Sequence, residues 1–170
     1  MKTIEEFIEE EELKKIDGFL DIYSNDDDSV FFLKLDKEDL NEKFIYFSYV
    51  MNAPQGSTLT GGLPSDGKVY EFRSFKKDKI GLYQINTSYI KGDETNNIAR
   101  SSITNITEAF VEVFKPTART EDSVLINLNS IILSEKMDSI SYVPSEYREY
   151  ISVDYGMPDE AKTFVKNIYN

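Results

Sequence analysis

The chain has 170 residues, a net charge of −12, and neither histidine nor cysteine. The two missing residue types exclude imidazole and thiolate chemistry, including the usual zinc ligands and the cysteine nucleophile. The negative charge disfavours nucleic acid and anionic membrane surfaces as partners, because both are polyanions. Carboxylates, lysine, serine and tyrosine remain as groups for catalysis, but we expect that this chain alone is not a catalytic unit.

Length and composition predict one compact domain with a real core, since hydrophobic residues make up 40% of the chain and aromatic residues 13%. No stretch approaches the roughly 18 consecutive apolar residues that a membrane-spanning helix needs, so no membrane span is expected. We divide the chain into an N-terminal helix within residues 1–17 and a single mixed α+β domain over residues 18–170.

The first half of the chain predicts a helix followed by strands. Thr3 and Glu6 form a capping-box pattern, and apolar residues at helical spacing extend the predicted helix to Glu12, before the Asp17-Gly18 break. The segments Phe19–Tyr23 and Val30–Leu35 then favour a hairpin.

The middle of the chain predicts a buried strand, a loop and a second hairpin. Phe44–Met51 is apolar or aromatic at nearly every position, which indicates a central strand covered on both faces. Asn52–Lys68 contains Gly56, Gly61, Gly62 and Gly67 and is typical of a long exposed loop. Val69–Phe75 and Ile80–Ile90 are predicted as the strands of the second hairpin.

The last third changes period. Ile103, Ile106, Phe110 and Val113 share one face of a predicted helix over Asn96–Phe114, with Pro116 just beyond its end. A strand over Val124–Leu128 and a helical turn over Ser130–Ser134 follow. The predicted fold class is α+β: a mainly antiparallel twisted sheet, one main packing helix and the short N-terminal helix.

Two segments can be considered as ligand sites. Asn25–Asp28 offers several oxygens to calcium, but it lacks the spaced pattern of a dedicated calcium loop, so we favour an exposed turn and predict no metal site. Gly61-Gly62 has no following Gly-Lys-Ser/Thr, so we favour a flexible loop over a phosphate cradle.

The segment Tyr142–Tyr155 interleaves tyrosines with charged residues. Tyr147, Arg148 and Tyr150 form a possible binding surface of the kind that aromatic and arginine anchors build. The same tyrosines can instead pack half-buried with their hydroxyls in water. We predict no catalytic or cofactor-binding residue in this chain.

Four segments together resemble a known family. They are Lys15–Tyr23, Phe44–Ser48, Asn97–Ser101 and Pro144–Arg148. In order and character they resemble the N-terminal region of large bacterial zinc-dependent metalloproteases of metzincin type, which carry paired domains of unknown function ahead of the catalytic domain. The resemblance covers Thr3 to Asn170.

The resemblance implies a noncatalytic accessory module that packs against or shields a protease domain downstream in the same polypeptide. In that family zinc is bound by a His-Glu-x-x-His motif, so zinc is expected only in that downstream domain and no cofactor in this chain. It also implies a periplasmic or secreted protein whose signal peptide is absent here. The alternative is a freestanding binding module for a peptide or glycan, which would use the glycine-rich loop and the tyrosine-rich segment.

Overall fold

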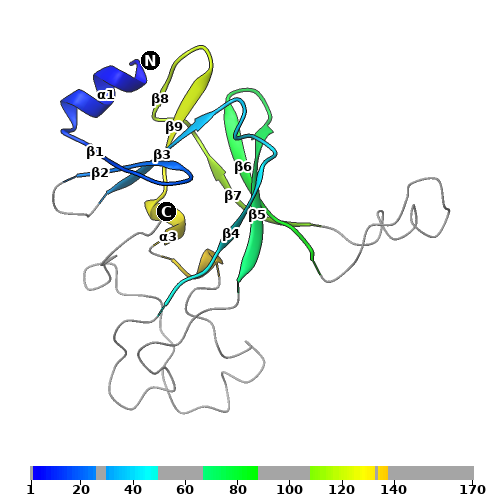
Figure 1. The fold of residues 1–170 in the computed structure, drawn as a ribbon. Helices are drawn as coiled ribbons and strands as arrows, with labels where there is room; N and C mark the ends of the chain where they lie inside the picture. The colour runs from blue at the N-terminus through cyan, green and yellow to red at the C-terminus, as the bar shows by residue number, and fades with distance from the viewer. Residues whose placement is uncertain (1, 26–29, 50–66, 88–107, 133, 138–170) are drawn as a thin grey trace.

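The protein is mostly antiparallel β. The computed structural model describes residues 2–25, 30–49, 67–87, 108–132 and 134–137, and these form a five-stranded and a four-stranded antiparallel sheet (Figure 1). Its helical elements within these residues are short: α1 (Ile4–Glu10), α3 (Asn129–Ile132) and the 3₁₀ turn η1 (Glu135–Met137). The predicted antiparallel sheet is therefore confirmed, and the described part contains little helix.

The five-stranded sheet, called sheet A, has the strand order β1-β2-β3-β9-β8. Its strands are β1 (Lys14–Ile16), β2 (Asp21–Ser24), β3 (Phe31–Asp36), β8 (Ala118–Arg119) and β9 (Ser123–Asn127). β2 and β3 are antiparallel neighbours, with Ile22 opposite Leu33, which confirms the first predicted hairpin. The predicted strand near Val124 is also confirmed, as β9.

The four-stranded sheet, called sheet B, has the strand order β4-β5-β6-β7. Its strands are β4 (Lys43–Tyr46), β5 (Lys68–Phe75), β6 (Lys79–Gln84) and β7 (Ala109–Phe114). The second predicted hairpin is confirmed, because β5 pairs with β6 from Tyr70 opposite Gln84 to Phe75 opposite Lys79. Its second strand ends at Gln84, earlier than the predicted end at Ile90, and residues 88–90 lie outside the described residues. The chain passes from sheet A to sheet B between β3 and β4 and returns between β7 and β8.

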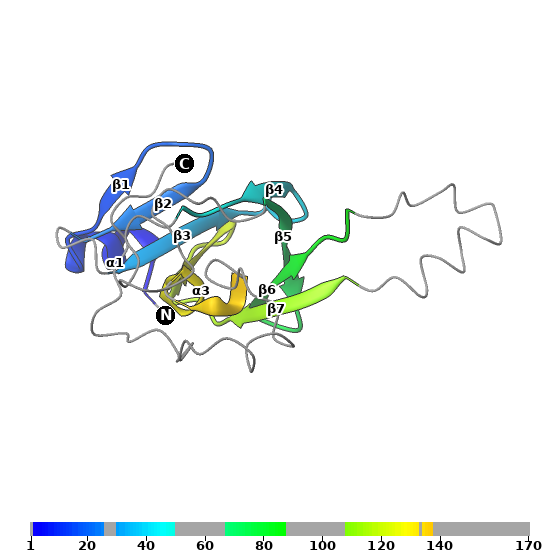
Figure 2. The same ribbon diagram turned by 90° about the horizontal axis from the view of Figure 1, so that it is seen from below.

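The main core lies between the two sheets, and Figure 2 shows β1–β3 on one side and β5–β7 on the other, with α3 between them. Alternate residues of each strand face this core. Fully burying one such large apolar side chain contributes about 1.5–3 kcal/mol. The buried residues of this core are Ile22, Phe31, Leu33, Leu35, Tyr70, Phe72, Ile80, Leu82, Phe114, Ile126, Leu128, Ile131 and Met137.

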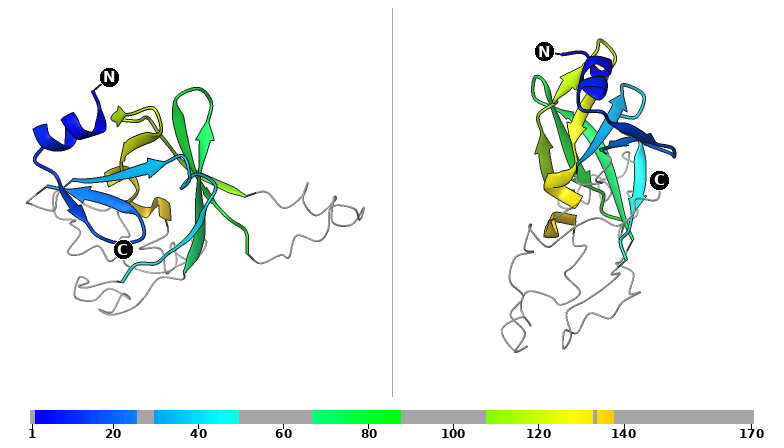
Figure 3. Two further views of the ribbon diagram at one scale, coloured as in Figure 1. Left: turned by 45° about the horizontal axis from the view of Figure 1, so that its top comes forward. Right: turned by 90° about the vertical axis from the view of Figure 1, so that its left-hand side faces the viewer.

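A second, smaller core lies on the opposite face of sheet A, beneath α1. Ile4, Leu13, Phe32, Ala118 and Leu125 are its buried residues. The ring of Phe7 meets Phe32 edge-on at a centroid distance of 5.2 Å. Figure 3 shows α1 and the β8–β9 turn at the same end of the molecule. The order of layers is therefore α1, sheet A, sheet B.

The ends of α1 follow from local sequence. The Thr3 hydroxyl accepts from the Glu6 N–H and the Glu6 carboxylate accepts from the Thr3 N–H, so the predicted capping box is present. The helix ends at Glu10, before the predicted end at Glu12. Glu12 has φ 52°, and the Leu13 N–H donates to the Ile8 carbonyl, which turns the chain into β1.

The predicted helix over Asn96–Phe114 is wrong where the structure describes it. Ala109–Phe114 forms β7, paired antiparallel with β6, and residues 96–107 lie outside the described residues. The segment is rich in Val and Phe, which favour strands. Pairing with β6 satisfies its backbone, and a bulge near Leu82 and Tyr83 absorbs one extra residue. Phe110 and Val113 of the predicted helical face therefore lie in a strand.

The prediction that Phe44–Met51 is a central strand is also wrong. β4 stands at the edge of sheet B, and only one of its faces contacts the core, through Phe44 and Tyr46. On the other face Ile45 is 69% exposed. Apolar residues on both faces of a strand therefore do not require burial of both. Residues 50 and 51 lie outside the described residues.

Candidate functional site

The outer face of sheet B, which points away from sheet A, carries the candidate functional residues. Side chains alternate between faces along a strand. Tyr70, Phe72 and Leu82 face the core, so their neighbours Glu71, Arg73 and Tyr83 project outward. Lys43 stands opposite Glu71 on β4. The outer face thus combines charged and aromatic side chains from all four strands.

An ion cluster of Glu71, Arg73 and Glu108 crosses this face. The Arg73 Nε donates to Glu71 at 2.5 Å, and its Nη1 donates to Glu108 at 2.6 Å. The Glu71 residue is only 5% exposed. The Arg73 guanidinium also lies 4.7 Å from the centroid of the Tyr83 ring, which favours the cation.

The two carboxylates fix the charge state of the arginine. The hydrogen bond to Glu71, then that to Glu108, raises the pKa of Arg73 above its ordinary value. Charge-assisted hydrogen bonds of this kind are strong and directional. The guanidinium donates to both carboxylates, so neither carboxylate is well placed to act as a general acid or base. The cluster is better explained as a structural link between β5 and the start of β7.

Three aromatic rings pack around Gly81 on the same face. Phe110 contacts both Phe75 and Tyr83, at centroid distances of 5.3 Å and 5.2 Å. A Cβ atom at Gly81 would lie 2.9 Å from the Tyr83 ring and 3.2 Å from the Phe110 ring. The rings therefore fill the space that a side chain at Gly81 would otherwise occupy, in the way that aromatics cover strand glycines elsewhere.

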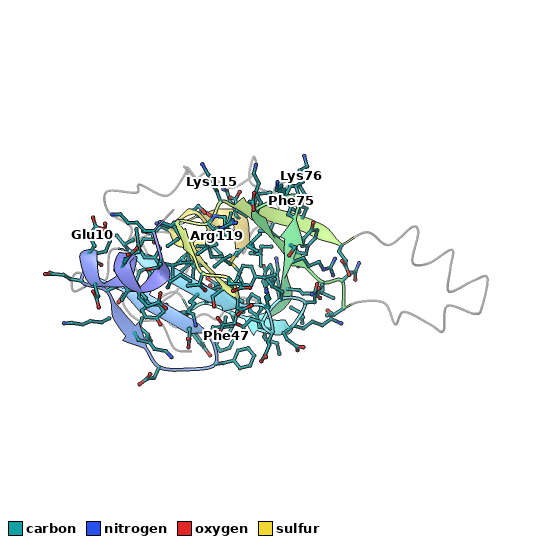
Figure 4. The ribbon with its side chains drawn as sticks, turned by 90° about the horizontal axis from the view of Figure 1, so that it is seen from above. Glu10, Phe47, Phe75, Lys76, Lys115 and Arg119 are labelled. Atoms are coloured by element: carbon teal, nitrogen blue, oxygen red, sulfur yellow. The ribbon has the colours of Figure 1, made fainter. Side chains whose placement is uncertain are left out.

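A strip of exposed apolar side chains begins on the edge strand β4 and continues beyond its end at Tyr46. Ile45, Phe47 and Tyr49, called the β4 strip, alternate along the chain and are 69%, 50% and 56% exposed. The Phe47 and Tyr49 rings meet edge-on at 5.3 Å. Figure 4 places Phe47 well away from Glu10 of α1 and from Lys76. Exposed apolar groups gathered at a sheet edge mark either a contact surface or an aggregation hazard.

The binding residues predicted from sequence cannot be placed. Tyr147, Arg148 and Tyr150 lie outside the described residues, as does the loop containing Gly56, Gly61 and Gly62. In the predicted Asn25–Asp28 turn only Asn25 is described, and its side chain accepts from the Val30 N–H at 3.2 Å. Among the described residues, no cluster of three or more Asp or Glu side chains is arranged to hold a metal ion.

Sequence reasoning missed the residues that the outer face does bring together, chiefly Arg73, Tyr83 and Phe110. A usable signal was present on β5, where the charged Glu71 and Arg73 alternate with the aromatic Tyr70 and Phe72. Such alternation of two different side-chain classes predicts two distinct sheet faces. Glu108 and Phe110 lie in a segment whose apolar residues have helical spacing, so the pattern does not indicate their place on a sheet face.

The fold and this surface define a β-rich domain with charged and aromatic residues on an open sheet face. No family model, no curated protein and no solved structure matches the chain. None of the helices within the described ranges has the length and apolar character needed to cross a membrane.

Proposed function

We propose that this chain is a noncatalytic accessory module that packs against a second protein domain through the β4 strip. The observation that carries the proposal is the exposure of Ile45, Phe47 and Tyr49 along one sheet edge. Aromatic residues at such a site are the usual anchors of protein interfaces, because they bury a large area and lose little conformational entropy.

The chemistry of the chain supports a binding role over a catalytic one. The sequence has no imidazole or thiol group, and the most buried charged group of the described residues, Glu71, is committed to Arg73. The partner that the family resemblance suggests is a zinc protease domain in the same polypeptide. An intramolecular partner would also need little affinity of its own, because tethering raises its effective concentration.

Photo-crosslinking tests the contact directly. Benzoylphenylalanine placed at Phe47 of the natural full-length polypeptide should crosslink to residues of a protease domain, as read by mass spectrometry. The matched control places the same probe at Glu10, an exposed residue of α1. Equal crosslinking from both positions, or none from position 47, would contradict the proposal.

The alternative is a freestanding binding module for a peptide or glycan. Its predicted residues Tyr147, Arg148 and Tyr150 lie outside the described part, so it depends on the sequence pattern alone. Substituting Tyr147 and Tyr150 with alanine should weaken ligand binding without unfolding the domain if this alternative holds.

A further inference from the structure

Lysines without a carboxylate partner gather at one end of sheet B. Among the other described lysines, five each form an ion pair, while the exposed Lys43 of β4 forms none with a described residue; the five are Lys2, Lys15, Lys34, Lys37 and Lys136. By contrast, Lys76, Lys77, Lys79 and Lys115, called the lysine tip, form no ion pair in the part of the chain that the structure describes, and all four are exposed. Such a cluster is unexpected in a chain with 31 acidic and 19 basic residues.

The strand register brings these four lysines together. Lys76 and Lys77 lie in the turn between β5 and β6, and Lys79 stands opposite Phe75. Phe114 of β7 pairs with Ile80 of β6 in antiparallel orientation. Lys115, the residue after Phe114, therefore lies on the same side of this pair as Lys79. Figure 4 shows Lys76, Phe75 and Lys115 along the same side of the molecule.

The acidic residue within the turn does not neutralise the lysine tip. Asp78 accepts from the Arg119 guanidinium at 2.8 Å, and this bond lowers the pKa of Asp78. Its negative charge is therefore already balanced by Arg119. Asp78 also attracts Lys77, but within the described residues the four lysines outnumber this one acidic side chain, so the lysine tip keeps a net positive charge.

Aromatic rings adjoin the lysines on the outer face. The Lys76 ammonium lies 5.5 Å from the centroid of the Phe75 ring, and Phe75 contacts Phe110, which is 47% exposed. A ligand that meets the lysines can therefore also place an apolar side chain against these two rings. The surface is complementary to a segment that carries both carboxylates and apolar groups.

The net negative charge of the whole chain favours a short anionic ligand over an extended polyanion. At physiological ionic strength charges are screened beyond about 8 Å, so a short acidic peptide would feel chiefly the lysine tip. A membrane or a nucleic-acid duplex extends much further and would also meet the remainder of a molecule whose net charge is −12. The charge distribution thus selects a peptide among the possible polyanions.

We propose that the lysine tip, together with Phe75 and Phe110, binds an acidic segment of a partner protein that also carries apolar side chains. This surface lies at the end of sheet B where Phe75 of β5 pairs with Lys79, whereas Ile45 of the β4 strip pairs with Val69 near the other end of β5. The proposal therefore stands independently of the accessory function proposed above.

Fluorescence anisotropy with a short fluorescein-labelled peptide of alternating glutamate and phenylalanine tests the proposal. The peptide should bind the wild-type chain at low salt and more weakly as salt rises. Neutralising Lys76, Lys77 and Lys79 to glutamine should weaken binding about tenfold, the sum expected from three surface charge contacts. The matched control neutralises Lys2, Lys37 and Lys43, which gives the same net charge.

Particular outcomes would overturn the proposal. They are absence of binding by the wild-type chain at low salt, equal weakening in the two triple variants, or tighter binding of phosphatidylserine vesicles or duplex DNA than of the peptide. The single variant Lys115→Gln lies on a separate segment and should weaken binding about twofold. Circular dichroism checks whether the triple variant folds. If it does not fold, the binding affinity of Lys115→Gln tests the proposal instead.

Discussion

Glu12 occupies a backbone conformation that suits glycine. Its φ of 52° places it in the left-handed region directly after α1, and the bonds Glu12 N–H to Glu9 and Leu13 N–H to Ile8 complete a helix-ending motif. Glycine is usual at this position because it has no Cβ.

The first prediction concerns this position. Glu12→Gly should raise the free energy of unfolding by about 0.5–1 kcal/mol, because it relieves the strain of a Cβ in the left-handed region. Urea denaturation measures the change. Glu9→Gly, an exposed substitution within the helix, is the control and should lower stability by about 1 kcal/mol. A loss of stability in Glu12→Gly would refute the assignment.

The second prediction concerns Asp36 on β3. The Ser123 hydroxyl donates to its carboxylate, and this bond, aided by Lys34 at 3.0 Å, lowers the pKa of Asp36 below its ordinary value despite partial desolvation. Ionised Asp36 therefore stabilises the fold at pH values above its ordinary pKa, and that contribution is lost as pH falls through the folded-state pKa.

Ser123→Ala should raise the pKa of Asp36 toward its ordinary value and remove part of the acid dependence of stability. Carboxyl NMR titration reads the pKa directly. Ser74→Ala, at an exposed position on β5, is the control and should leave Asp36 unchanged. An identical Asp36 pKa in both variants would show that the Ser123 bond does not set it.

At the scale of elements, the ion cluster on sheet B joins strands that are not neighbours. Glu71 and Arg73 belong to β5, and Glu108 directly precedes β7, so the Arg73 guanidinium spans β6 across the outer face. Tyr83 of β6 lies under the guanidinium. Removing the arginine would leave Glu71 buried with its charge unpaired, which is costly.

The third prediction is that Arg73→Ala lowers the free energy of unfolding by about 3 kcal/mol. The control Lys37→Ala removes an ion pair whose side chains are 66% and 75% exposed and should cost less than about 1 kcal/mol. Combining Arg73→Ala with Glu71→Gln should recover part of the loss, because the buried charge is gone. Equal losses from the two single substitutions would argue against a structural cluster.

Helices and strands could be predicted from the sequence where the spacing of apolar residues matched only one of the two structures. The β2–β3 and β5–β6 hairpins follow from apolar runs around polar turns, and the Thr3–Glu6 box marks the start of α1. β7 was not predictable, because Phe110 and Val113 fit helical spacing while Val and Phe also favour strands. Only pairing with β6, a contact distant in sequence, selects the strand.

The candidate surface was less predictable than the fold for a related reason. The cluster of Arg73 with Glu108 joins residues 35 positions apart. Its formation depends on the order β5-β6-β7, which local sequence does not specify. The β4 strip was visible as an apolar run, but the sequence does not distinguish a strand buried on both faces from one that has an exposed face.

At the scale of the whole molecule, the two sheets share one core while their other faces differ. The outer face of sheet A is covered by α1 through Ile4 and Phe7. Sheet B carries the β4 strip along its β4 edge and the lysine tip at the end that holds the β5–β6 turn. Because the core joins both sheets, we expect the described elements to unfold together. The substitutions in the lysine tip lie outside that core and should change binding more than stability.

The central proposal is that this chain is a noncatalytic module of a larger zinc protease. The most direct measurement is to sequence the natural gene beyond the codon for Asn170. Our account predicts an open reading frame that encodes a His-Glu-x-x-His motif downstream. A stop codon directly after Asn170, or a continuing frame without that motif, would contradict the claim and favour the freestanding binding module.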